Sequence, residues 1–351
     1  DIVSVISDYA GLKRRGNKFW ACCPFHNEKT ASFTVTAEKG LYYCFGCHAS
    51  GDVFKFLMAK ENISFAEAVR RLAERAGLQV PEEERSAEDI KRDEARKRLY
   101  KINEMACAFF HNCLVKTRYG EEGKAYLRKR GLSEQTIRDF RLGFAPDSWN
   151  KLTDAFAAKG VAGKELVELG LAKEKNGRFY DAFRNRVIFP IYDGRDRVVG
   201  FGGRVLDDSK PKYLNSPETP IFNKRNLLFA LNRAHRSIYD EGRAVFVEGY
   251  MDVVSAHNKG ITNVVASLGT AFTERQARLL QRQAKELILA YDMDTAGRQA
   301  TLRAMEIVRS LGLHIRVLVL ADGKDPDEYI NAHGPDAFKE ALQAAPGVLE
   351  Y

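Results

Sequence analysis

The sequence contains no run of about 20 apolar residues, the length that a helix needs to cross a bilayer. Its N-terminus also lacks the basic stretch and apolar segment of a secretory signal peptide. Cysteines are few: the 351 residues include six. This number is too small for a disulfide scaffold. Internal repeats and low-complexity segments are missing as well. We therefore expect a globular cytoplasmic protein with no membrane partner.

What the chain does contain is charge and enough apolar residues for several cores. Hydrophobic residues make up 45% of the chain, sufficient for two or three domains of ordinary size. Charged residues make up 29%, and the formal net charge is +8. A positive balance of this kind favours a polyanionic partner over an acidic small molecule.

The character of the sequence changes along its length and predicts a multidomain α+β and α/β protein. Residues 1–80 combine short β-rich runs with amphipathic helices, and residues 81–97 are a charged stretch that forms either a polar helix or a flexible linker. Residues 98–241 begin with helices and continue into a β-rich stretch. In residues 242–332 apolar β-rich runs alternate with helical patterns, which predicts a Rossmann-like parallel sheet flanked by helices. Residues 333–351 would begin a further helical region.

Four of the six cysteines lie within 26 residues, and this clustering indicates metal. The spacing C-x2-H-x17-C-x2-C is formed by Cys23, His26, Cys44 and Cys47. Each short gap lets two ligands on one turn reach the same ion, and the intervening hairpin brings the turns together. Three thiolates and one imidazole fill the shell of one Zn²⁺ ion, so the site should be structural. Cys22 and His48 are alternative ligands, but only Cys23 and Cys47 give matching gaps.

Cations and aromatic residues alternate around this cluster. They are Lys13, Arg14, Arg15, Lys18, Phe19, Trp20, Phe33, Tyr42, Tyr43 and Phe45. Such a mixture can hold phosphates and stack unpaired bases, although about half of these rings should instead pack a small core. Cys107 and Cys113, with His111 between them on a helical pattern, are better explained as buried thiols than as a second metal site.

Acidic residues follow three β-rich runs of the predicted parallel sheet. Glu248 comes after the first, Asp292 and Asp294 after another, and Asp325, Asp327 and Glu328 after the last. Because the carboxyl ends of parallel strands share one edge of a sheet, these groups could converge there. Like charges gather only where something positive neutralises them, and oxygen ligands suit Mg²⁺. The alternative is a set of separate, solvated turn residues.

An acidic Mg²⁺ site in a basic protein indicates phosphoryl chemistry, which needs cationic groups for the phosphates. The candidates are Arg184, Arg186, Arg204, Lys212, Lys224 and Arg225. The glycines of GFGG, just before Arg204, would allow close approach of the backbone. A solvated basic face is the alternative.

Over nearly all of its length the sequence resembles the bacterial DnaG-type replicative DNA primases. A zinc ribbon of this family matches CPFHNEKTASFTV and YYCFGCHASGDVFKF. Its linking blocks match LGFAP, FRNRVIFPI, VVGFGGRVL and KYLNSPET, and its TOPRIM signature matches VEGYMDVV, ASLGTA, YDMDTAGRQA and DGKDPDE. The resemblance implies a zinc ribbon, an N-terminal polymerase subdomain and a TOPRIM domain. It also implies synthesis of short RNA primers at the replication fork, with Mg²⁺ or Mn²⁺ as the catalytic ion.

The family's functional residues carry over by position. Glu248 matches the TOPRIM glutamate, which would bind metal or act as general base toward the attacking 3′-hydroxyl. Asp292 and Asp294 match the metal-binding DxD pair, and Asp325 and Asp327 match the later acidic pair, which could hold a second or third ion. The family's basic blocks, which resemble a surface for template and nucleotide, align with Arg184, Arg186, Arg204, Lys212, Tyr213 and Lys224.

The implied partners are a single-stranded DNA template, ribonucleoside triphosphates, an RNA–DNA hybrid and a single-stranded DNA-binding protein. A replicative helicase would dock through a C-terminal domain absent here, since the resemblance implies a C-terminally truncated chain. Departures from the family pattern are mild: Ala31 replaces a common proline, His48 and Ala49 alter a glycine-rich turn, and Met293 stands between the two aspartates.

Two other classes of function fit parts of the sequence. TOPRIM folds also serve topoisomerases and nucleases, although no motif here suggests a tyrosine nucleophile beyond the nearby Tyr250 and Tyr291. A non-catalytic zinc-ribbon DNA-binding protein, with the acids as turn residues only, is the second alternative. Metal dependence separates this binder from an enzyme.

Overall fold

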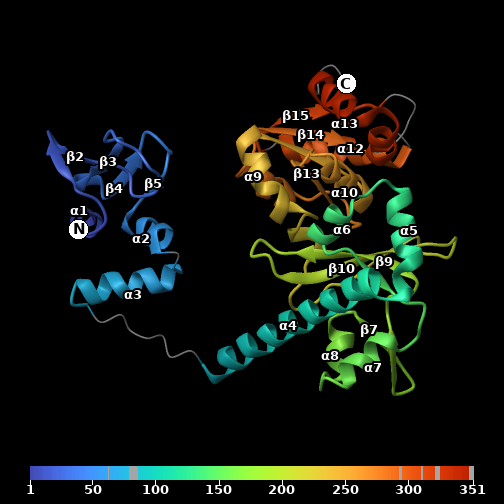
Figure 1. Cartoon of the computed structure of the whole chain (residues 1–351). Helices are drawn as coiled ribbons and strands as arrows, with labels where there is room; N and C mark the ends of the chain where they lie inside the picture. Colours follow the sequence, from blue (N-terminus) through green and yellow to red (C-terminus); the bar gives the residue numbers. More distant parts are fainter. Residues whose placement is uncertain (62, 79–85, 292–294, 310, 321–324, 348–351) are drawn as a thin grey trace. The chain divides into compact units, whose positions relative to one another are not determined.

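The structure, a computed structural model, describes residues 1–61, 63–78, 86–291, 295–309, 311–320 and 325–347 (Figure 1). The chain divides into two compact units, Asp1–Glu88 and Asp89–Tyr351. Two predicted metal ligands, Asp292 and Asp294, lie outside the described residues. No described helix is both long and apolar enough to cross a membrane.

The first unit is built on a five-stranded antiparallel sheet in the order β1-β2-β3-β4-β5. The strands are β1 (Lys13–Arg15), β2 (Lys18–Ala21), β3 (Phe33–Thr36), β4 (Leu41–Cys44) and β5 (Ser50–Gly51). Three helices, α1 (Ile2–Ser7), α2 (Val53–Glu61) and α3 (Phe65–Arg75), complete the unit together with the short 3₁₀ helix η1 (Ala37–Lys39). Its core is aromatic, since the rings of Phe33, Tyr42 and Phe56 lie 5.3–6.2 Å apart.

A 30-residue helix, α4 (Ala87–Lys116), begins two residues before the boundary and belongs to the second unit from Asp89 onward. Residues 87–97 of the charged stretch are therefore helical, one of the two alternatives that its composition allowed. The apolar positions of α4 begin at Leu99 and recur at helical spacing through Leu114, so only its later part has a buried face. Cys107 and Cys113 on this face are buried free thiols, as expected, and burial raises the pKa of each to about 11.

A four-stranded antiparallel sheet in the order β11-β10-β9-β6 forms the middle of the second unit. Its strands are β6 (Gly143–Ala145), β9 (Arg186–Tyr192), β10 (Val198–Val205) and β11 (Tyr213–Asn215). Around it lie η2 (Arg118–Gly120), α5 (Glu121–Lys129), α6 (Glu134–Asp139), α7 (Lys151–Ala157), α8 (Gly163–Glu168) and the hairpin β7 (Ala172–Lys175) and β8 (Arg178–Asp181). One face of β9 packs with residues of α4, α7 and α8, and the other faces the parallel sheet described next.

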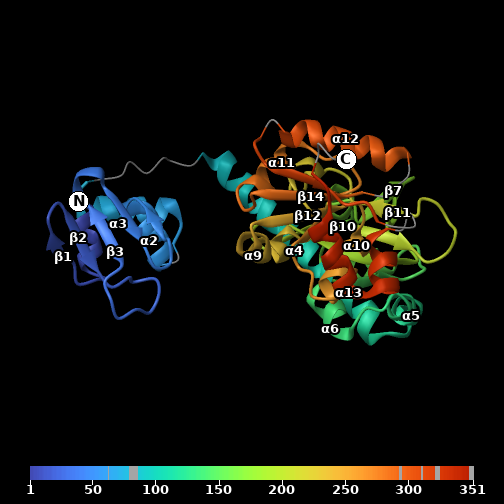
Figure 2. The same ribbon diagram turned by 90° about the horizontal axis from the view of Figure 1, so that it is seen from above.

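The predicted parallel sheet is confirmed, with strand order β13-β12-β14-β15. Its strands are β12 (Arg243–Val247), β13 (Val264–Ala266), β14 (Glu286–Ala290) and β15 (His314–Val317). The helices are α9 (Leu231–Glu241), α10 (Tyr250–Asn258), α11 (Glu274–Gln281), α12 (Thr295–Arg309) and α13 (Pro326–Ala344), with η3 (Lys224–Asn226) ahead of them. Figure 2 shows the strands between α11 and α12 on one side and α10 and α13 on the other.

Side chains that alternate along β12 explain why this sheet is covered on both faces. Val245 and Val247 belong to the core that contains residues of α10 and α13, whereas Ala244 and Phe246 belong to the core of α9, α11 and α12. Successive residues of a strand point to opposite faces, so a strand of continuous apolar residues needs two cores. This arrangement leaves the ends of the strands for polar residues.

Candidate functional site

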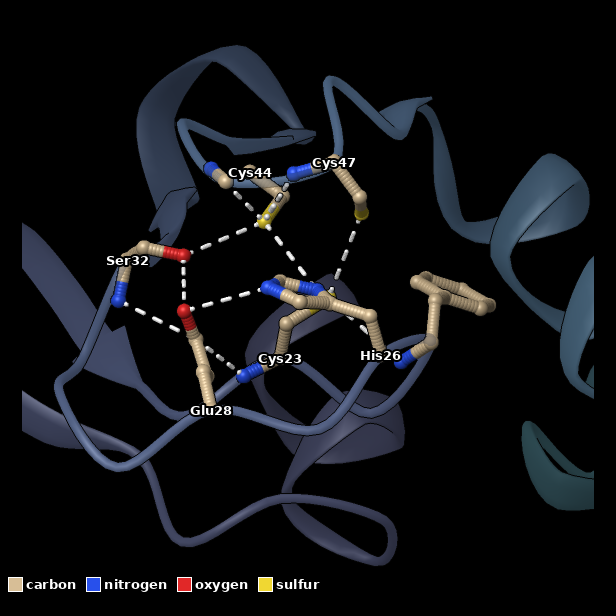
Figure 3. Close-up of polar contacts among 8 residues, drawn as sticks. Cys23, His26, Glu28, Ser32, Cys44 and Cys47 are labelled. Carbon is tan, nitrogen blue, oxygen red and sulfur yellow. Dashed lines mark hydrogen bonds and ion pairs between the residues drawn. The ribbon is translucent and has the colours of Figure 1, made fainter.

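The structure brings the four predicted zinc ligands of the first unit together, and their ligand atoms all lie within 4.8 Å of one another (Figure 3). The Sγ atoms of Cys23 and Cys47 are 3.7 Å apart. Two thiolates 2.3 Å from a tetrahedral zinc ion lie about 3.8 Å apart, so this separation fits the ion. Nδ1 of His26 is 3.9 Å from Sγ of Cys44, which places an imidazole nitrogen in the same group.

The two buried thiols of this group differ in their acidity. Burial raises the pKa of Cys23 to about 12. Burial also opposes ionisation of Cys44, but its contact with the Ser32 hydroxyl and the hydrogen bonds from the backbone N–H groups of Cys47 and Gly46 lower its pKa to about 7. A ligating cysteine must be a thiolate, so the surroundings of Cys44 already favour the ligating form near neutral pH.

The alternative ligands Cys22 and His48 stay outside the group. Cys22 is exposed. Nδ1 of His48 lies 2.9 Å from the hydroxyl of Tyr43. Gly46 has a steric role, because a Cβ atom there would lie 2.7 Å from Nε2 of His26. The glycine of CFGC thus leaves room for the imidazole ring.

The aromatic residues of the ribbon divide into a core set and a surface set. Phe33 and Tyr42 are buried, whereas Phe45 is 57% exposed and Tyr43 is 38% exposed. Phe45 stacks on Trp20 with ring centroids 6.1 Å apart. An open cleft beside these exposed rings is lined by Lys18, Lys39 and Lys55 among others. About half of the predicted rings therefore remain available at the surface.

In the second unit, Glu248 follows directly after β12, at the carboxyl edge of the parallel sheet. Its neighbour in the strand, Val247, pairs with Ala266 at the end of β13 and with Ala290 at the end of β14. Asp292 comes two residues after Ala290 in the sequence. Burial, followed by the negative charge of Glu248, raises the pKa of Tyr291 above its usual value, which places Glu248 near the β14 end as well.

One buried carboxylate, that of Asp252, ties the Glu248 turn to the start of α13. Its Oδ2 atom accepts a hydrogen bond from the Gly249 N–H at 3.0 Å, and its Oδ1 atom accepts one from the Asp327 N–H at 3.1 Å. Both N–H groups lie at the start of a helix, where backbone donors lack partners within the helix. Sequence reasoning missed Asp252, although an acidic residue at the third position of a helix is a known capping signal.

The last acidic pair separates into two environments. Asp325 is the N-cap of α13 and accepts a hydrogen bond from the Glu328 N–H at 2.7 Å. The Asp327 side chain is 2% exposed and forms an ion pair with Arg130 at 2.6 Å. Its other oxygen accepts hydrogen bonds from the hydroxyl of Ser255 and from the side-chain amide of Asn331. Both oxygens of Asp327 are therefore engaged by protein groups, and its predicted role as a metal ligand stays a prediction.

A group of cations and tyrosines lies beside this acidic edge. The guanidinium carbon of Arg204 is 4.5 Å from the ring centroid of Tyr126 and 5.9 Å from that of Tyr213. Arg130, which sequence reasoning missed, lies 5.6 Å from the Tyr126 ring. The charge of Asp252 contributes to raising the pKa of Tyr213, although burial is the larger cause. Tyr213 is thus close to Asp252, and Arg204 lies beside Tyr213, whereas their binding of phosphate stays a prediction.

Three other predicted cations have different surroundings from one another. Arg184 stacks on Trp149, with its guanidinium carbon 3.9 Å from the ring centroid. Arg186 is buried and donates to the carbonyl oxygens of Gly203 at 3.2 Å and Lys212 at 3.3 Å, and burial lowers its pKa. Lys224 lies in η3, where its carbonyl oxygen accepts a hydrogen bond from α11.

The glycines of GFGG lie inside β10 and not in a phosphate-binding turn. A Cβ atom on Gly202 would lie 2.5 Å from the ring of Tyr250, so this glycine lets the antiparallel sheet approach α10. The hydroxyl of Tyr250 donates to the side-chain oxygen of Asn215 at 2.7 Å, and the Asn215 amide donates to the Leu268 carbonyl at 3.0 Å. Asn215, also missed from sequence, joins β11 to the loop after β13.

Three family models match the chain in order along its length. Residues 1–88 match the CHC2 zinc finger, residues 109–235 the N-terminal domain of the DNA primase catalytic core, and residues 245–330 the Toprim-like family. The cluster of cysteines and histidine fits the CHC2 zinc finger. The acidic sheet edge fits the Toprim-like family.

Similar proteins carry one name. The DNA primase of Halalkalibacterium halodurans is 45% identical over 342 residues, which cover 97% of this chain and 57% of that protein. That of Clostridium acetobutylicum is 45% identical over 351 residues, or 100% of this chain and 58% of that protein. The chain therefore spans a little over half the length of these curated relatives.

Two solved structures that resemble this chain are also primases. The Aquifex aeolicus primase structure, which comprises zinc-binding and RNA polymerase domains, is 36% identical with a TM-score of 0.67, and covers 100% of this chain and 84% of that one. A DnaG primase catalytic domain bound to single-stranded DNA is 39% identical with a TM-score of 0.68, covering 73% of this chain and 81% of that one.

The fold and site define a protein that joins a zinc ribbon to a Toprim-like domain with an acidic sheet edge. More particularly, the chain belongs to the DnaG-type family of bacterial DNA primases.

Proposed function

We propose that this chain is the zinc-binding and catalytic part of a DNA primase, which synthesises short RNA primers from ribonucleoside triphosphates on single-stranded DNA. The observation that carries the proposal is the match of the whole chain, in one order, to a primase with zinc-binding and RNA polymerase domains. The acidic sheet edge beside Arg204 and Tyr213 supplies the groups that nucleotidyl transfer needs.

At the acidic edge, we propose that Glu248, Asp292, Asp294 and Asp325 hold the divalent ions, Mg²⁺ or Mn²⁺. Such ions offset the negative charge that accumulates on phosphate oxygens during in-line displacement. Glu248 could also accept the proton of the attacking 3′-hydroxyl. We assign Asp327 a different part, that of holding the start of α13 in place, because Arg130, Ser255 and Asn331 occupy its oxygens.

The cations and rings near this edge suit the nucleotide. Arg204 and Tyr213 would meet the triphosphate or the base of an incoming nucleotide, and Lys212, Lys224 and Arg225 would contact the backbone of template or product. Arg186 supports the strand ends through its bonds to backbone carbonyls. Docking to a replicative helicase and to a single-stranded DNA-binding protein stays a prediction from the family resemblance.

In the first unit, we propose that Cys23, His26, Cys44 and Cys47 bind one structural Zn²⁺ ion. The ribbon would then present Phe45, Tyr43 and the nearby lysines to the template, since stacking and cationic groups together hold unpaired bases.

Replacing Cys23 by serine is expected to reduce the zinc content from about one ion per chain to near zero, because three ligands do not close a structural site. The matched control is Cys22→Ser, which alters the adjacent exposed thiol and should retain the metal. Zinc is measured by elemental analysis of the purified chains. Loss of zinc in Cys22→Ser but not in Cys23→Ser would show that the wrong cysteine has been assigned.

A second DNA contact is proposed at Trp149, which is 64% exposed and lies beneath Arg184. The Tyr180 ring is 5.6 Å from that of Trp149. An open cleft of about 810 Å³ adjoins them, lined by Trp149, Asn150, Lys175, Asn176, Arg178, Phe179 and Tyr180. Asp181 holds this region in place by accepting the backbone N–H groups of Leu152 and Thr153 at the start of α7.

Trp149→Ala is therefore expected to weaken binding of single-stranded DNA about 5- to 100-fold, the range that stacking of one base contributes. Fluorescence anisotropy of a labelled oligonucleotide at fixed salt measures the effect. Tyr239→Ala is the control, because Tyr239 on α9 is a similarly exposed ring, at 66%. If the Trp149 variant and the wild type bind single-stranded DNA with equal affinity, this surface does not contact the template.

The principal rival is DNA cleavage by the acidic edge, and the tyrosines near it do not favour a strand-cleaving nucleophile. Tyr250 is buried, its pKa is raised, and its hydroxyl is committed to Asn215. The pKa of Tyr291 is raised as well.

De novo RNA synthesis on a set of single-stranded DNA templates, with Mg²⁺ and labelled ribonucleotides, tests the proposed function. Short RNA products support it. Nicked template without RNA would show a nuclease, and DNA binding that survives EDTA without any product would show a binding protein only.

A further inference from the structure

One carboxylate outside the four proposed zinc ligands contacts two of the ligand residues directly. Glu28 lies two residues after His26, and its side chain is 10% exposed. Its Oε1 atom accepts a hydrogen bond from the Cys23 N–H at 2.6 Å and another from the Ser32 N–H at 3.2 Å. Its Oε2 atom lies 3.3 Å from Nε2 of His26 (Figure 3). The carboxylate thus joins the two halves of the ligand-bearing loop.

The His26 ring presents its two nitrogens to different partners. Nδ1 lies 3.9 Å from Sγ of Cys44, on the side of the thiols, and Nε2 points to Glu28. A nitrogen that binds a metal must carry no proton, so the proton of the neutral ring sits on the other nitrogen. An acceptor-only carboxylate 3.3 Å from Nε2 favours the tautomer with the proton on that nitrogen, because only a protonated Nε2 can donate to it.

Ser32 extends the same contact to a third ligand residue. Its hydroxyl donates to Oε2 of Glu28 and lies 3.2 Å from Sγ of Cys44. Glu28 therefore reaches Cys23 through the backbone, His26 through the ring, and Cys44 through one intervening side chain. No exposed glutamate of the ribbon, such as Glu38 in η1, has a comparable set of contacts among the described residues.

We propose that Glu28 is a positioning residue of the zinc site: it holds His26 in the Nδ1-ligating tautomer and fixes the spacing of the ligand turns. Carboxylates that accept the free N–H of a ligating histidine orient the ring and raise its basicity. This inference rests on the proposed zinc site, and it adds a residue whose charge, and not only its shape, contributes to metal retention.

The test follows zinc rather than RNA synthesis. Zinc-loaded protein of residues 1–351 is challenged with a chelator, and the rate of zinc release is recorded. Glu28→Gln keeps the size of the side chain and one acceptor oxygen but loses the charge. We expect the rate of zinc release, or the dissociation constant for zinc, to rise about 10- to 100-fold in this variant. The matched control is Glu38→Gln, the same change at an exposed site, which should behave as wild type. Ser32→Ala should show a smaller effect.

A second measurement needs no variant. Long-range ¹H–¹⁵N spectra of the wild-type histidine rings should show His26 protonated at Nε2 and metal-bound at Nδ1, a signature that a purely structural role of Glu28 would not require. The proposal is overturned if the spectra show the metal bound at Nε2 of His26. It is also overturned if the rate of zinc release from Glu28→Gln is within about twofold of the wild-type rate. Wild-type chain that holds no zinc would instead overturn the zinc site itself, so the two failures are distinguishable.

Discussion

Glu248→Gln is expected to lower RNA synthesis on the order of 10³-fold, because metal-bound oxygen ligands contribute several kcal/mol of transition-state stabilisation. The amide keeps the shape of the side chain but removes its negative charge and its basicity. Glu248 is only partly buried, at the end of β12, so the fold should persist. Labelled primers made on single-stranded DNA, measured across a range of Mg²⁺ concentrations, give the effect.

Glu286→Gln is the control for this experiment. Glu286 lies at the first residue of β14, the opposite end of the same sheet, and forms an ion pair with Arg316 at 3.6 Å. Both partners keep about a quarter of their side chains exposed, so the pair contributes little. We expect near wild-type synthesis from it. Equal synthesis from the two variants would place the chemistry away from the carboxyl edge.

The second large effect is expected for Asp327→Ala, which leaves Arg130, Ser255 and Asn331 without their shared acceptor. We expect the free energy of unfolding to fall by about 2–4 kcal/mol, less than for a fully buried pair because Arg130 is 30% exposed. RNA synthesis should fall on the order of 10²-fold, because displacement of α13 would move Asp325. Urea unfolding followed by circular dichroism measures the first quantity.

Asp336→Ala is the matched control, on the same helix and 92% exposed, with only a weak ion pair to Lys339. It should change neither stability nor synthesis. Asp327→Asn distinguishes the two roles that Asp327 can have, which are to hold the start of α13 and to bind metal. If this variant unfolds like wild type but needs much more Mg²⁺, Asp327 binds the metal after all.

The fold of the Toprim-like part could be predicted because its signals are local. The apolar run of β12 and the acid that follows it are consecutive in the sequence, and parallel strands must place their ends on one edge. The covered faces follow from alternation along the strand. The parallel sheet and its two covered faces could be inferred without knowing any distant residue, and the structure confirms both.

The roles of Asp325 and Asp327 could not be separated from sequence, although only Pro326 stands between them. One caps a helix and the other is buried against Arg130, which lies 197 positions earlier in the chain. Burial and ion pairing depend on that distant partner. Sequence spacing therefore identified the acidic pair but treated its members as equivalent.

The arginines show the same limit. Arg184 and Arg186 are two positions apart, yet one stacks on an exposed tryptophan and the other bonds buried carbonyls. Arg184 lies before β9, and Asn185 between the two has a left-handed backbone with φ 47°, so the alternation of a strand does not relate them. The glycines of GFGG allow a close approach, as predicted, but the sequence did not show to which group. They provide room for neighbouring rings, such as Tyr250 against Gly202, and a sequence shows the missing Cβ atom without showing what fills its place.

Each compact unit contains one of the two tryptophans of the chain, Trp20 in the first and Trp149 in the second. Both lie in aromatic surfaces that we propose contact DNA, Trp20 stacked on Phe45 and Trp149 beneath Arg184. The protein thus carries a natural optical reporter in each unit. Quenching of emission by an oligonucleotide, resolved by substituting one indole at a time, would report which unit engages a template first.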